Sequence, residues 1–125
     1  MTMKTGMLRL AIVAVFAIGA VAATARSTEV TLKGYLLDKM CSAKTMASTD
    51  PTANAKDHKT ECAVSCADGG YGVVADGKYY TFDAKGNKLA AAILKNTKKT
   101  DSLSVEVTGT VDGTRINVSS LKETE

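Results

Sequence analysis

The chain has 125 residues, with three cysteines, one histidine and a formal net charge of +3. This length predicts a single small domain. The charge balance is close to even, and basic side chains gather only at Lys95–Lys99, so we expect no nucleic-acid partner.

The first 25 residues have the features of a secretory signal peptide. Two basic residues precede an apolar run at 10–23, and Ala23-Thr24-Ala25 is a small-x-small cleavage site. The alternative is a membrane anchor, but this run is shorter than the ~20 apolar residues that a spanning helix needs. We therefore predict a signal peptide at 1–25, one domain at 26–125 without a membrane span, and a periplasmic or secreted location.

The first half of the domain is predicted to hold one strand and one helix. Residues 30–37 are rich in β-formers and read as a strand, in which Gly34 indicates a bulge or sharp curvature. Residues 38–50 are small and polar and are expected to form a loop. A helix then begins at Asp50-Pro51, or at a second cap at Asp57, and ends at Cys66 before Asp68-Gly69-Gly70.

The second half is predicted to hold two hairpins that flank a helix. Residues 71–82 form a hairpin around Asp76-Gly77, and residues 83–87 form a turn. Residues 88–99 form an amphipathic helix whose buried face includes Leu89, Ala92, Ile93 and Asn96. Two alternating runs, 102–111 and 114–121, are joined through Asp112-Gly113 in a second hairpin.

The predicted order is three strands, a helix and two strands, with an insertion at 38–70 after the first strand. This is the chain order of an OB-fold, a small Greek-key barrel. We expect a mainly β, α+β domain with a five-stranded OB-like barrel, because closing the sheet removes exposed strand edges. An open sheet covered by two helices is the alternative.

The candidate site lies in the insertion, where Cys41, His58, Cys62 and Cys66 are found. His58, Cys62 and Cys66 follow one another at intervals of four and would share one helix face. His58 and Cys66 would then lie about 12 Å apart along an intact helix, too far for one ion to bind both. A metal site therefore needs Cys41 from the preceding segment, or a break in the helix near 62–66.

Several chemical roles remain open for these residues. Thiolates with an imidazole suit zinc or copper. Alternatively, Cys41 forms a disulfide with Cys62 or Cys66, as an oxidising compartment favours, and the domain binds a protein or small ligand without metal. Thiol redox chemistry is a third alternative, and no other enzyme motif is found. Nearby carboxylates, including Asp38, are expected to be helix caps or supporting groups.

The chain resembles a group of small exported bacterial proteins of unassigned function. Four stretches carry this resemblance: GYLLDKMC, HKTECAVSCADGG, DGKYYTF and VEVTGTV. The resemblance covers most of the domain. It implies an OB-like β-domain in which the four residues Cys41, His58, Cys62 and Cys66 act as a set. This favours the metal alternative, so we predict a monomeric, non-enzymatic module that binds zinc or copper through these residues.

Overall fold

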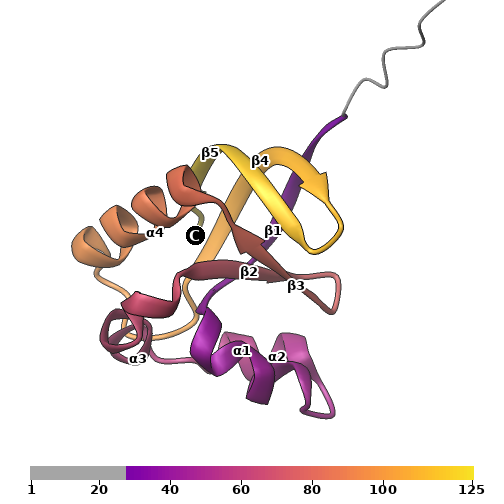
Figure 1. Ribbon diagram of the computed structural model, residues 1–125. Coiled ribbons are helices and arrows are strands. Elements are labelled where there is room, and N and C mark those ends of the chain that lie inside the picture. Colours follow the sequence, from indigo (N-terminus) through magenta and orange to yellow (C-terminus); the bar gives the residue numbers. More distant parts are fainter. Residues whose placement is uncertain (1–27) are drawn as a thin grey trace, which may run out of the picture.

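A computed structural model describes residues 28–125 (Figure 1). The signal peptide predicted at 1–25 lies outside the described residues. The elements in chain order are β1 (Glu29–Asp38), α1 (Lys39–Met46), α2 (Pro51–Lys56), α3 (Thr60–Ser65), the 3-10 turn η1 (Ala67–Gly69), β2 (Tyr71–Ala75), β3 (Lys78–Phe82), α4 (Ala84–Asn96), β4 (Ser104–Asp112) and β5 (Arg115–Glu123).

The five strands close into an OB-like barrel in the order β1-β2-β3-β5-β4, which confirms the predicted fold class. β1 pairs with β4 through its first half and with β2 through its last residues, and a short parallel pairing of β3 with β5 completes the ring. The change of partner takes place at Gly34 and Tyr35. A Cβ at Gly34 would lie 2.0 Å from the carbonyl oxygen of Val74, so a side chain there would prevent this close approach.

Two apolar clusters lie on opposite faces of the sheet. The main core fills the barrel and includes Leu36, Val73 and Val105. Leu37 and Val74 point outward and pack with Ala55 under α1 and α2, which cover this face in Figure 1. Because neighbouring strand residues point to opposite faces, a strand such as β2 that is covered on both sides is buried along its whole length.

The insertion differs from its prediction, because residues 38–50 are not a loop. They include α1, whose N-cap is Asp38 and whose Ser42 and Thr45 are buried. The helix was missed because its residues are small and polar and lack apolar periodicity. Asp50 caps α2 and Pro51 occupies its first turn, as predicted.

The predicted single helix from Pro51 to Cys66 is also wrong, because it is interrupted at residues 57–59. Asp57 ends α2 and Lys59 precedes α3, so Asp57 does not begin a helix. The polar pair Asp57-His58 lies in the break. Its backbone closes the last turn of α2 through the bond from His58 N to the carbonyl oxygen of Ala55, at 3.2 Å.

The hairpins are confirmed, whereas the start of α4 is corrected. Asp76 and Gly77 both have positive φ, as the predicted two-residue turn requires. The predicted turn at 83–87 is instead the first turn of α4, capped by Asp83. Gly86 lies inside the helix, and a Cβ at this position would be 2.5 Å from Val118 Cγ2, so glycine permits the close packing of α4 against β5.

The buried face of α4 is also rotated by about one residue from its prediction. It consists of Gly86, Ala90 and Leu94, with Leu89 and Ile93 half-buried, while Ala92 and Asn96 are exposed. The tight turn between β4 and β5 is formed by Gly113-Thr114 rather than Asp112-Gly113, since Asp112 pairs with Arg115.

Candidate metal centre

Asp38 is the residue on which the candidate site is built. It is the last residue of β1, where it pairs with Tyr71, and its side chain is fully buried. Its Oδ2 accepts a hydrogen bond from the backbone N of Cys41 at 2.9 Å and so caps α1. A buried carboxylate requires partners for its oxygens, and the cap accounts for one of them.

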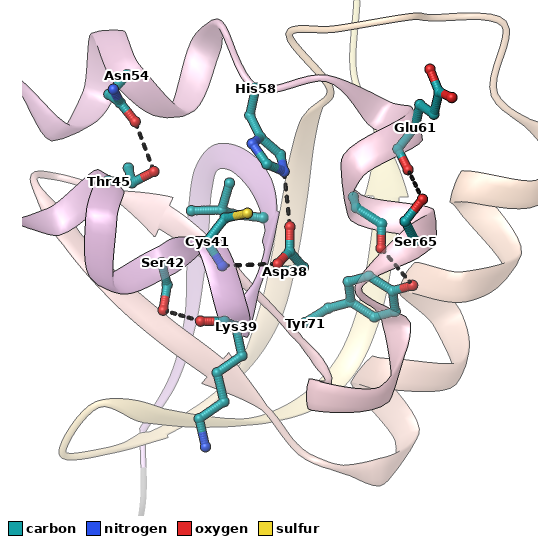
Figure 2. A network of polar contacts seen from close by, with 12 residues as sticks. Asp38, Lys39, Cys41, Ser42, Thr45, Asn54, His58, Glu61, Ser65 and Tyr71 are labelled. Carbon is teal, nitrogen blue, oxygen red and sulfur yellow. Dashed lines mark hydrogen bonds and ion pairs between the residues drawn. The ribbon is translucent and has the colours of Figure 1, made fainter.

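His58 provides the second partner of Asp38 (Figure 2). Its Nε2 lies 2.8 Å from Asp38 Oδ1, and the imidazole is 13% exposed. This contact is possible because His58 lies in the break between α2 and α3 and not within a helix. The spacing argument made for a continuous helix therefore does not apply to His58.

The segment that carries the remaining cysteines is held against the barrel from two sides. The hydroxyl of Tyr71 donates to the carbonyl oxygen of Ala63 in α3 at 3.3 Å. On the other side, Thr60 N donates to the carbonyl oxygen of Thr100 at 2.9 Å. Within this segment Cys62 is exposed, and Cys66 is half-buried just after the end of α3.

Asp38, Cys41 and His58 lie close enough to hold a metal ion. One ligand atom from each residue falls within 4.8 Å of the other two. A groove of about 310 Å³ reaches this cluster and is lined by Cys41 and His58 together with Cys62, but not by Cys66. The structure thus brings Cys41 and His58 together as predicted, places Cys62 on the same groove, and leaves Cys66 outside its lining.

Asp38 was expected to be a cap or a supporting group, not a member of the donor cluster. Its role as the cap of α1 was not predicted, because residues 38–50 were expected to form a loop. Its contact with His58 joins residues twenty positions apart, and no local pattern indicates such a contact.

Burial, and after it the charge of Asp38, raises the pKa values of the groups around this carboxylate. Burial and the adjacent carboxylate raise the pKa of the Cys41 thiol from its ordinary 9.0 to about 11, with smaller contributions from Cys66 and Cys62. Burial, followed by the charge of Asp38, also raises the pKa of Tyr71 and of Tyr79. Anionic groups near Asp38 are therefore disfavoured, and a bound cation would relieve this repulsion.

The three cysteines, all within the described residues, are free in the structure, which favours the metal alternative over the disulfide. Compared with known protein families, curated proteins and solved structures, the chain shows no match. Among residues 28–125, none of the helices has the length and apolar character needed to cross a membrane.

Proposed function

We propose that this protein is an exported module that binds one zinc or copper ion through Asp38, Cys41 and His58, with Cys62 as a further ligand. The observation that carries the proposal is the grouping of three donor atoms within 4.8 Å of one another. These donors come from a strand end, a helix and a helix break, and they meet only in the folded chain.

The spacing of the donors supports an ion of this size. Ligand bonds of about 2.0–2.3 Å place the donors of a tetrahedral zinc site roughly 3.3–3.8 Å apart. The three donor atoms need only small side-chain movements to reach these separations. The Nε2 of His58 cannot both donate to Asp38 Oδ1 and bind the ion, so bonds to the ion would replace this contact when both side chains bind.

The chemistry of the donors supports a transition metal over calcium or magnesium. Thiolate and imidazole are ligands of zinc and copper, whereas the hard cations prefer oxygen ligands alone. Cys62 lines the same groove and is exposed, so it is free to turn towards an ion. Cys66 lies outside the groove lining, so we expect it to contribute less to metal binding than Cys62.

The proposal is tested by titrating chelator-treated, reduced protein with zinc or copper(I) against a colorimetric chelator. We expect one equivalent to bind. Cys41→Ser and His58→Ala should each weaken binding at least tenfold, as loss of a ligand typically does, and Cys62→Ser should weaken it less. The matched control is Asp57→Asn, which removes an exposed carboxylate from the same groove and should leave the affinity within about twofold.

Two further readouts separate the proposal from the disulfide alternative. Binding should release the Cys41 proton. At pH values below the pKa of that thiol, the metal affinity should therefore rise about tenfold for each unit by which the pH is raised. Mass spectrometry of unreduced protein should find three alkylated cysteines after chelation. A single alkylated cysteine without bound metal would contradict the metal site and support a disulfide-stabilised binding module.

A further inference from the structure

A second polar pocket lies near the start of α1 and of α4, outside the candidate metal centre. It has a volume of about 270 Å³, and its lining includes Lys39, Gly70, Asn87 and Arg115. These residues come from α1, the residue before β2, α4 and β5, so the pocket is formed by segments far apart in the sequence. None of them belongs to the donor cluster around Asp38.

Two cationic side chains, Lys39 and Arg115, are among the described residues that line this pocket, and no carboxylate is. Lys39 and Arg115 are both exposed, and neither forms an ion pair within residues 28–125. In Figure 2 the Lys39 side chain extends away from His58 and Asp38. A lysine and an arginine that line one small pocket provide charge and hydrogen-bond donors for an anion.

Asn87 adds a neutral donor whose orientation is set by the backbone. Its Oδ1 accepts a hydrogen bond from the backbone N of Tyr71 at 2.9 Å, so its amide nitrogen is left to donate elsewhere. Gly70 has φ of 84°, and a Cβ there would lie 3.2 Å from that amide nitrogen. The glycine therefore leaves open the space beside the donor.

In the described part of the chain no carboxylate lines the pocket, and the exposed Asp112, which pairs with Arg115 across the turn between β4 and β5, forms no ion pair with it. Asp38 is engaged by His58 and by the backbone N of Cys41. The Oδ1 of Asp83 accepts from the backbone N of Gly86 at 3.0 Å and from that of Val118 at 3.2 Å. Neither Asp38 nor Asp83 is among the lining residues, whereas Ala84, in the positively polarised first turn of α4, is.

We propose that this pocket binds a small ligand through an oxyanion group, either a phosphate or a carboxylate. The two cations and the Asn87 amide supply donors of the kind that both groups accept. The volume of about 270 Å³ lies just below the ~300–1,000 Å³ that ligand pockets span, so the ligand has few atoms beyond the anionic group. This site does not depend on metal binding at Asp38.

The test uses purified, chelator-treated protein and nuclear magnetic resonance, with inorganic phosphate and acetate as separate probes at constant ionic strength. We expect saturable shifts of the Gly70 amide and the Asn87 side-chain amide, with a Kd in about the millimolar range. Tighter binding of phosphate would assign phosphate esters as the ligand class, and tighter binding of acetate would assign carboxylates.

Variants decide whether the pocket is responsible. Arg115→Gln and Lys39→Gln should each raise the Kd about tenfold, because each removes a charge-assisted hydrogen bond. Asn87→Asp keeps an acceptor for Tyr71 N but places a negative charge in the pocket, so saturable binding should be lost. The matched control is Lys88→Gln, an exposed α4 lysine outside the lining, which should change the Kd less than twofold.

Two results would overturn this proposal. One is the absence of saturable shifts at Gly70 and Asn87 with either probe. The other is a Kd that rises as much in Lys88→Gln as in Arg115→Gln, which would mean that the anions respond only to overall charge. Both readouts are independent of the zinc and copper titrations.

Discussion

The contact between His58 and Asp38 should stabilise the protein even without metal. His58→Ala would leave the Oδ1 of a fully buried carboxylate without its partner at 2.8 Å. Losing a hydrogen bond to a charged group costs about 1.5–3 kcal/mol, and water entering beside the missing imidazole would recover part of this. We therefore expect the free energy of unfolding to fall by about 2 kcal/mol, with Tm lower by about 10 °C.

The assay is urea unfolding of chelator-treated protein, with Asp38→Asn and the double variant Asp38→Asn/His58→Ala completing a cycle. Because the pair interacts directly, the double variant should lose about 1.5 kcal/mol less than the sum of the single losses. The control is Lys59→Ala, which removes an exposed ion pair to Asp101 and should cost less than about 1 kcal/mol. A His58→Ala loss no larger than the control, or losses that add to within about 0.5 kcal/mol, would show that the pair of Asp38 and His58 does not stabilise the fold.

Three more predictions concern cysteine reactivity, the pH dependence of stability and the close approach at Gly34. At pH 8 the exposed Cys62 should be alkylated at least about tenfold faster than Cys41, because the raised pKa of Cys41 leaves little reactive thiolate. Peptide mass spectrometry measures both rates, and equal rates would contradict this prediction. The same shift stabilises the fold below pH 9, and this contribution should disappear as pH rises towards 11 in a pH series of urea unfolding, but not in Cys41→Ser. Gly34→Ala should lower the free energy of unfolding by at least about 3 kcal/mol, because the new Cβ would overlap Val74. Gly77→Ala in the open turn should lower it by about 1–2 kcal/mol, because of the positive φ. Equal losses of Tm in calorimetry would contradict the close approach at Gly34.

The sequence was most informative where short-range chemistry decides the structure. Asp76-Gly77 requires a turn with positive φ, and Asp50-Pro51 is a strong helix start, so both were predicted correctly. The segment at 83–87 was misassigned because Gly86 ordinarily disfavours a helix. Its presence there depends on the packing of α4 against Val118, which no local pattern contains.

The candidate site was likewise predicted only in part from the sequence. Cys41 and His58 were identified from residue type and clustering, because sulfur and imidazole are scarce in this chain. The contribution of Asp38 was not identified, since it depends on the break between α2 and α3 that turns His58 back towards β1. A helix prediction based on spacing extended through that break and placed His58 in line with Cys66.

Asp38 is part of both the barrel and the insertion, and this determines which parts of the protein metal binding would stabilise. Its backbone is fixed in the ladder with β2, while its side chain holds the start of α1 and the histidine beyond α2. An ion bound there would slow local opening of α1, α2 and α3 and would leave exchange of barrel amides limited by global unfolding. The insertion would then open as a unit separate from the barrel, and its rate of amide exchange would depend on whether the ion is bound. The barrel would keep the same structure with and without the ion.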